Sequence, residues 1–274
     1  MGRIRNAWTI AKASWAVLSK DRELLVVPLV AGVGSLLALG AIAGPGYLLL
    51  GGSEAEQSSG IALWIVLAVA AVAAAWVSAI GQATIIAGAA QRMDGGDPTL
   101  GSAFAVARGR VGRLLEWALL ATVVALVLDQ VEQRLGVLGR IVSWLGSAAF
   151  SVLSFLALPV IVFEDVGAIE GFKRSSRLLK GTWGEQLTFN VGLGLLGFAA
   201  VLPGVLVGVA LASTGVLAVQ VVGVSLLVAW VLVVVSVTSA LSAVFKAALY
   251  RWATGAPVDA AFGASALSTA FRHR

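Results

Sequence analysis

The chain of 274 residues is 59% hydrophobic and only 12% charged, and its mean hydropathy is +0.96. A water-soluble domain carries about 25% charged residues, so this composition excludes a soluble fold and predicts an all-α integral membrane protein. The sequence has no cysteine and one histidine, which excludes disulfides and the common zinc, haem and iron–sulfur sites. We therefore expect no metal and no other cofactor.

The first predicted element is a basic amphipathic helix over residues 1–23. Its apolar residues recur at spacings of four and three, which places them on one face of a helix: Ile4, Trp8, Ala11, Trp15 and Leu18. The apolar run that follows, with Ala41 and Ala43, imitates a secretory signal peptide. Because the charged segment before that run is too long for a signal peptide, we expect no cleavage.

Six apolar stretches then follow, and each is expected to cross the membrane as a helix. A span needs about 20 apolar residues to cross a hydrocarbon core of about 30 Å. We treat the whole chain, 1–274, as a single integral membrane domain. The predicted spans are 24–50, 61–90, 111–131, 141–163, 187–211 and 216–245, and a cytoplasmic tail occupies 251–274.

The third span is the shortest, because its apolar core over 114–128 covers only roughly 22 Å at 1.5 Å per residue. Asp129 and Glu132 follow at once, and Arg134 and Arg140 come before the fourth span. Either the bilayer thins locally, or these charges form an ion-paired cap on the outer end of a shortened helix. A funnel into a central cavity is the functional alternative.

Basic residues are distributed unequally between the two sides of the predicted membrane. Seventeen of the nineteen fall in the segments 3–22, 92–113, 173–180 and 246–274, which all lie on one side, and only Arg134 and Arg140 fall on the other. The positive-inside rule therefore predicts a multi-pass protein of the plasma membrane with both termini in the cytoplasm. The net charge of +5 reflects this topology, and we expect no nucleic-acid partner.

Two more basic amphipathic helices are predicted, so that one such cytoplasmic helix precedes each of three helical hairpins. True internal triplication and a chance likeness among basic connections both explain this pattern. The face of the second helix consists of Leu100, Phe104, Ala107, Val111 and Leu114, and that of the third consists of Ile169, Phe172, Ser176, Leu179 and Trp183.

Three short motifs resemble an uncharacterised family of six-span prokaryotic membrane proteins, related to the membrane domain of glycerophosphoryl diester phosphodiesterases. This resemblance implies the fold and the location but no settled activity. The enzymes carry their chemistry in a separate soluble barrel, which this chain does not encode. The motifs are WAVL at 15–18 with DRELL at 21–25 and Pro28, LPVIV at 158–162 with Glu164, and GFKRS at 171–175.

Residues with catalytic potential are few, and no catalytic residue is predicted. His273 belongs to a charged terminal tail, and Glu164 and Asp165 follow the fourth span, where they read as an interface anchor and a helix start signal. Asp94 and Asp97 flank a glycine pair, and a tight turn explains them better than a weak cation site. We therefore expect that the protein is not an enzyme.

Polar residues inside the predicted spans are the next candidates, because such residues are costly in a membrane and face a partner or a cavity. Glu116 and Lys246 are expected at similar depth, where they either pair or reach the interface separately. Pro203 predicts a kink in the fifth span. The candidates for hydrogen bonds between helices are Gln82, Asn190, Gln220, Ser236, Thr238, Ser239 and Ser242.

Two functions remain open from the sequence. The first is a non-catalytic envelope protein that binds anionic membrane lipids or partner proteins through its basic cytoplasmic helices. The second is a channel or transporter for a small solute or ion, built as a homo-oligomer. The candidate lipid-headgroup residues of the first function are Arg108, Arg110, Arg113, Lys173, Arg174, Arg177 and Lys180.

Overall fold

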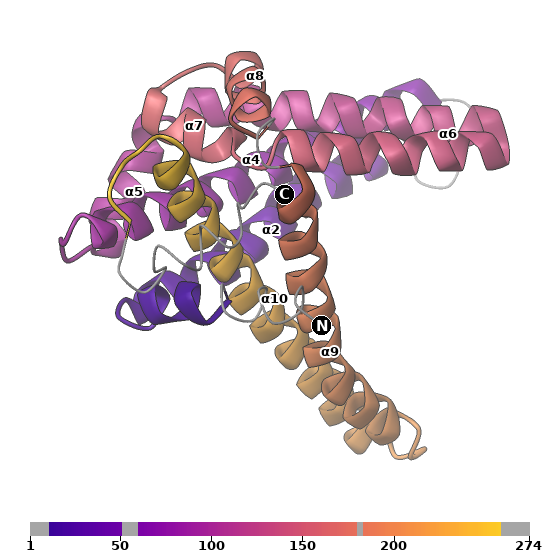
Figure 1. Ribbon diagram of the computed structural model, residues 1–274. Coiled ribbons are helices and arrows are strands. Elements are labelled where there is room, and N and C mark those ends of the chain that lie inside the picture. Colours follow the sequence, from indigo (N-terminus) through magenta and orange to yellow (C-terminus); the bar gives the residue numbers. More distant parts are fainter. Residues whose placement is uncertain (1–10, 51–59, 180–182, 259–274) are drawn as a thin grey trace. The chain divides into compact units, whose positions relative to one another are not determined.

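The computed structural model describes residues 11–50, 60–179 and 183–258, and all regular structure within these ranges is helical, as predicted (Figure 1). The chain forms two compact units, each considered by itself. The first contains Met1–Leu29, Gly88–Leu100 and Thr182–Arg274, and the second contains Val30–Ala87 and Gly101–Gly181. Residues 11–18 are helical and lead to η1 (Arg22–Leu25). The helices that follow are α2 (Val26–Leu49), α4 (Gly60–Met93), α5 (Leu100–Gly109), α6 (Val111–Leu153), α7 (Ala157–Glu164), α8 (Ala168–Leu179), α9 (Trp183–Ala212) and α10 (Leu217–Ala253).

Four helical segments among the described residues are long and apolar enough to cross a membrane, as expected of a membrane-embedded protein. They are Glu23–Leu49, Gly60–Met93, Val111–Glu164 and Leu217–Ala253, and Gly197–Ala212 is a shorter apolar helix. The prediction of six spans is thus met only in part. The difference lies mainly in the third and fourth predicted spans, which both belong to the segment Val111–Glu164.

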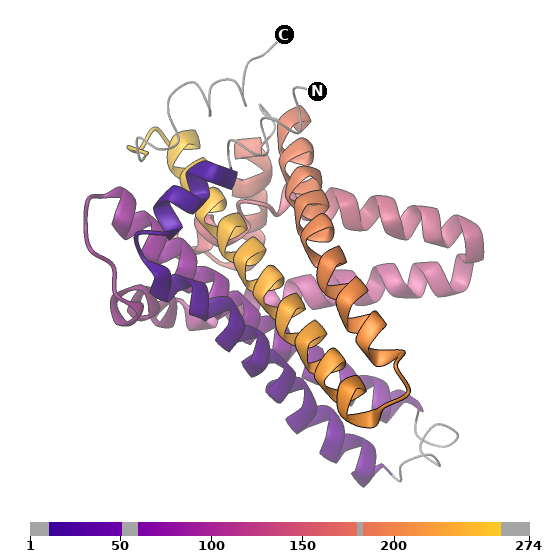
Figure 2. The same ribbon diagram turned by 90° about the horizontal axis from the view of Figure 1, so that it is seen from below.

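The connection between those two predicted spans is a single-residue break. Helix α6 runs through the charged segment from Asp129 to Arg140 and departs from helical geometry at Gly136, with φ 56° and ψ −127°. Only glycine adopts this backbone conformation readily, because it has no Cβ. At this point the two arms of α6 fold back against each other, as Figures 1 and 2 both show.

The second unit is held together by side-chain hydrogen bonds to the backbone and by ring stacking. Ser175 of α8 donates to the Leu153 carbonyl at 2.6 Å and accepts from the Leu156 amide at 3.1 Å, so it bridges the break between α6 and α7. Trp117 and Phe172 stack on the two faces of Phe150, with centroids 5.9 and 5.6 Å away. Such contacts matter in a membrane, where lipid competes with apolar packing.

In the first unit, α9 and α10 form an antiparallel hairpin (Figure 2). Pro203 lies inside α9, as predicted, and the Trp230 indole N–H of α10 donates to the Ala200 carbonyl at 2.8 Å, in the turn that the proline weakens. The ring of Trp230 lies against Gly204, and Leu227 lies against Gly208. Gly204 and Gly208 thus let α9 and α10 approach each other closely.

Candidate interfacial site

Helix α5 presents its small residues to the protein and its large apolar residue to the outside. Ala103 and Ala107 are fully buried, whereas Phe104 is 49% exposed. The face predicted from the spacing of apolar residues combines Phe104 with Ala107, and in the structure Ala107 is buried whereas Phe104 is exposed. The physical reason is that alanines let the helix backbone approach its neighbours closely, and the aromatic ring then remains outside.

Helix α8 repeats this arrangement. Ala168, Gly171 and Ser175 are buried together with Leu179, whereas Ile169 is 63% exposed. Of the residues on the face predicted for this helix, Leu179 is buried and Ile169 is exposed. Trp183 belongs to α9, and its side chain lies outside the described residues.

The helical residues 11–18 follow the same rule in the first unit. Ala11, Ser14 and Leu18 are buried, and Trp15 is 46% exposed although it was predicted on the same face as Ala11 and Leu18. Ile4 and Trp8 lie outside the described residues. Each of the three helices therefore keeps one large apolar side chain on its outer surface.

Most of the basic candidates are already paired with carboxylates of the second unit. Arg110 bonds to Asp165 at 3.2 Å, and Arg113 lies 3.0 Å from Glu116. In the same unit Arg174 pairs with Glu164 at 3.3 Å and Arg177 pairs with Glu170 at 2.6 Å. These four arginines are neutralised locally, so their charges are weaker candidates for an external anion than the sequence indicated.

Two basic candidates differ from those four. Arg108 and Lys173 are exposed, and neither has an ion pair or a side-chain hydrogen bond within the part of the chain that the structure describes. Arg108 follows Phe104 by four residues, and Lys173 follows Ile169 by four, so each cation shares a helix face with the exposed apolar residue one turn earlier. Lys180, the remaining candidate, lies outside the described residues.

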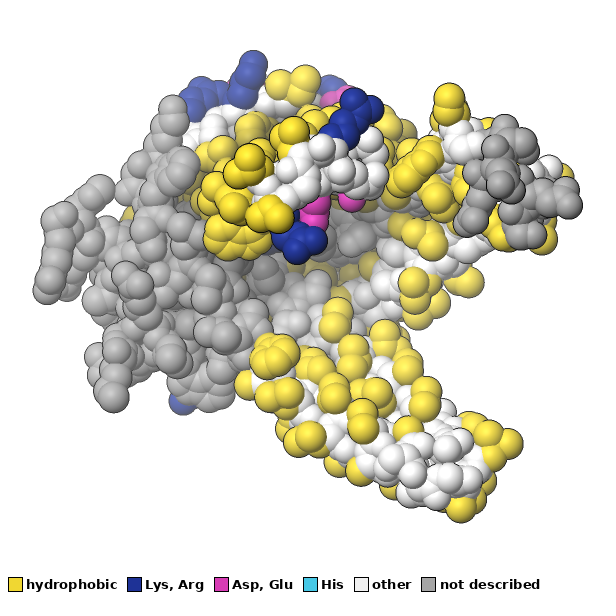
Figure 3. Space-filling model, turned by 90° about the vertical axis from the view of Figure 1, so that its right-hand side faces the viewer, with side chains coloured by type: hydrophobic (Ala, Val, Ile, Leu, Met, Phe, Trp, Pro, Cys, Tyr) yellow, Lys and Arg dark blue, Asp and Glu magenta, His cyan; other side chains and the backbone are white. Residues whose placement is uncertain are grey.

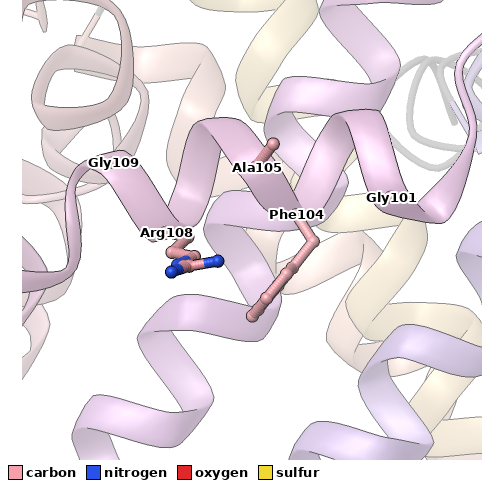
Figure 4. Close-up of a pocket in the computed structure, with 5 residues that line it drawn as sticks. All are labelled: Gly101, Phe104, Ala105, Arg108 and Gly109. Atoms are coloured by element: carbon pink, nitrogen blue, oxygen red, sulfur yellow. The ribbon is translucent and has the colours of Figure 1, made fainter.

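Phe104 and Arg108 flank a hollow on α5 of about 440 Å³ (Figure 4). Gly101, Ala105 and Gly109 complete its lining. The two large side chains project toward the same side of the helix in the close-up view. An apolar ring and a free guanidinium thus border one open surface.

Glu116 stabilises the start of α8. Its carboxylate accepts from the Ala168 amide at 3.2 Å and from Arg113 at 3.0 Å. Gly167 fits beside it because a Cβ there would lie 2.7 Å from a Glu116 oxygen. Helix N-termini favour a negative charge, which gives Glu116 a structural role. Lys246 belongs to the other unit, so its pairing with Glu116 stays a prediction.

The other polar candidates are distributed over several helices. Thr238 donates to the Val234 carbonyl of its own helix at 2.8 Å, and Ser236 is buried nearby on α10. Gln82 lies on α4 and Gln220 on the first turn of α10. The side chain of Asn190 lies outside the described residues. Within the described ranges, no three carboxylate or histidine side chains are grouped closely enough to hold a metal ion.

An ionic cluster in the first unit was not predicted. Arg92, at the end of α4, bonds to the buried Asp21 and also to Asp97 at 2.5 Å. Arg251, itself buried near the end of α10, bonds to Asp94. The sequence assigned Asp94 and Asp97 to a turn. The available signal was that Arg92 and Arg251 lie in the last turns of α4 and α10, where they can pair with the aspartates that follow α4.

Comparison with known proteins gives a family but no activity. The chain belongs to DUF6159, a family of unknown function whose model matches residues 58–259. No curated protein and no solved structure matches the sequence. The match does not extend to glycerophosphoryl diester phosphodiesterases, so that part of the resemblance has no support from it.

Proposed function

We propose that this member of the DUF6159 family is a non-catalytic plasma-membrane protein that binds anionic lipid headgroups through its basic helices α5 and α8. One observation carries the proposal. On both helices an exposed apolar residue is followed one turn later by a cation that has no side-chain partner among the described residues, as Phe104 with Arg108 and Ile169 with Lys173. An apolar residue beside a cation is the arrangement that seats a helix at a membrane surface.

The pairing of the other cations strengthens this argument. If all basic residues of the second unit were free, their exposure would say little, because surface cations are common. Instead Arg110, Arg113, Arg174 and Arg177 each have a carboxylate, while Arg108 and Lys173 have none within the described ranges. A cation near an anionic membrane surface contributes about 1 kcal/mol to binding. Anionic headgroups are therefore the partner that these two charges favour.

The proposal includes the six-span topology with both termini in the cytoplasm. Counting the two arms of α6 separately and adding α9 to α2, α4 and α10 gives six apolar helices. The distribution of basic residues supports placing α5 and α8 on the same, cytoplasmic side. Both helices then lie at the surface whose lipids are anionic.

The alternative function, an oligomeric channel or transporter, has less support from the described residues than lipid binding has. Glu116, a polar candidate of the third predicted span, is engaged by Arg113 and the Ala168 amide, and Thr238 is bonded to its own helix. A likeness to the membrane domain of the phosphodiesterases would fit the lipid-binding role as well, but the proposal does not depend on it.

The test compares lipids that co-purify with the full-length protein extracted together with its surrounding membrane. We expect the double variant Arg108→Gln/Lys173→Gln to lose its enrichment of anionic over zwitterionic phospholipid by several-fold, because two favourable charges are removed. The matched control Arg174→Gln/Arg177→Gln removes two cations that are already paired and should change the enrichment much less. Equal enrichment in the wild type and the first double variant would overturn the proposal.

A further inference from the structure

The far end of the first arm of α6, next to the turn at Gly136, carries a second open surface. A hollow of about 450 Å³ is lined there by Leu126, Val127, Gln130, Val131, Arg134 and Leu135. In Figure 3 basic and acidic side chains gather at the end of the α6 arms, with hydrophobic side chains around them. The hollow thus joins an apolar wall to a polar rim.

The polar side chains at this end of the arm differ in whether they have a partner among the described residues. Arg140 pairs with Glu132 at 3.5 Å, and Gln133 donates to Asp129 at 2.6 Å. Arg140 and Glu132 thus form one ion pair at this end, whereas Asp129 is bonded to a neutral amide. Arg134 and Gln130 are exposed, and neither has a hydrogen bond or an ion pair among the residues that the structure describes.

Gln130 and Arg134 are four residues apart, so their side chains are neighbours on one face of the helix. The amide nitrogen and the guanidinium are both donors, and together they suit a phosphate oxygen. Leu126, Val127 and Val131 continue the same surface toward the middle of the arm. From Arg134 to Leu126 the helix rises about 12 Å at 1.5 Å per residue.

We propose that this hollow binds one phospholipid, with its phosphate on Gln130 and Arg134 and the upper part of an acyl chain along Leu126, Val127 and Val131. We name this pair of donors with its apolar wall the tip site. A diacyl phospholipid fits this surface because it offers both an anion for the Arg134 guanidinium and an apolar chain for the wall. A packed helix from another copy would bury Arg134 without a counter-charge, which is costly.

The tip site goes beyond the proposed function, because it lies at the opposite end of α6 from α5. Between Arg113 and Arg134 the arm rises about 32 Å, close to the thickness of a hydrocarbon core. In the six-span topology the tip site therefore faces the lipids of the outer leaflet. Its donors contact the phosphate, which phospholipids share, so we expect little dependence on the headgroup charge.

The experiment measures stepwise lipid binding to the full-length protein in detergent by native mass spectrometry. Phosphatidylglycerol, phosphatidylcholine and diacylglycerol with identical acyl chains are titrated separately. We expect Arg134→Gln to weaken the binding of one molecule of either phospholipid about tenfold, and Gln130→Leu to weaken it less. Diacylglycerol, which has no phosphate, should bind the wild type and both variants equally.

The control variant is Arg140→Gln, which removes a cation from the same end that already has a carboxylate partner. It should leave this binding step unchanged. The Arg108→Gln/Lys173→Gln protein should lose the preference for phosphatidylglycerol but keep the step, so failure of the tip site and failure of the proposed function give different results. Equal phospholipid binding by the wild type and Arg134→Gln would overturn the proposal. So would displacement of phosphatidylcholine by millimolar inorganic phosphate, or a dimer that Arg134→Gln dissociates.

Discussion

The two compact units use their charges in opposite ways. In the first unit, Asp21 and Arg251 are buried, and their ion pairs with Arg92 and Asp94 connect the N-terminal segment, the end of α4 and the end of α10. In the second unit the pairs are half-buried or exposed, and Arg108 and Lys173 have no partner among the described residues. The pairs of the first unit fix the ends of its helices. The pairs of the second unit neutralise four arginines, and the remaining cations are then the candidates to bind an external anion.

From this comparison we expect Arg92→Gln to cause the largest loss of stability. The substitution leaves Asp21 buried without its cation, and breaking a buried pair costs about 3 kcal/mol. The measurement is the free energy of unfolding of the detergent-solubilised protein. Arg92→Lys keeps the charge and should restore part of the loss. An unchanged free energy in Arg92→Gln would show that the buried cluster does not stabilise the first unit.

An intermediate effect is expected for Glu116→Ala, because this carboxylate is partly exposed but also bonds to the start of α8. Losing the bond to the Ala168 amide costs about 1 kcal/mol, by analogy with a lost helix cap. Gly167→Ala provides the matching test, since its Cβ would crowd Glu116. That substitution should destabilise the wild type more than the Glu116→Ala protein, and equal effects in both would contradict the described contact.

The smallest effect is expected for Arg177→Gln, which removes an exposed pair with Glu170. Such pairs contribute between about 0 and 1 kcal/mol to stability, and less at high salt. The same unfolding measurement at low and high salt checks this value. A loss as large as that of Arg92→Gln would erase the distinction between the two units.

The sequence was sufficient for the helical class and for the apolar segments, because hydropathy over about 20 residues depends on composition alone. It was not sufficient for the faces of the surface helices. Spacings of three and four group Phe104 and Ile169 with apolar neighbours but do not tell protein contact from lipid contact. The buried alanines and glycines of α5 and α8 carried that information, because small residues let backbones approach closely.

Two other differences between the sequence predictions and the structure have identifiable causes. The loop expected between the third and fourth spans is replaced by a break at Gly136, which hydropathy cannot detect because one residue is enough. The partners of Arg92 and Arg251 are 71 and 157 residues away in sequence, so spacing rules for a single helix do not find them. The sequence equally did not show that Arg108 has no partner among the described residues, because this depends on which neighbouring arginines already have a carboxylate.

The short turn at Gly136 also bears on how the protein enters the membrane. Two arms joined through one residue cannot be inserted far apart in time, so α6 is expected to enter as a preformed pair. In the proposed topology its tip carries Asp129, Glu132, Arg134 and Arg140, whose formal charges cancel. Moving one elementary charge through a potential of 100 mV changes the energy by about 2.3 kcal/mol. In the proposed topology, moving this electrically neutral tip across a membrane potential therefore requires almost no net electrical work.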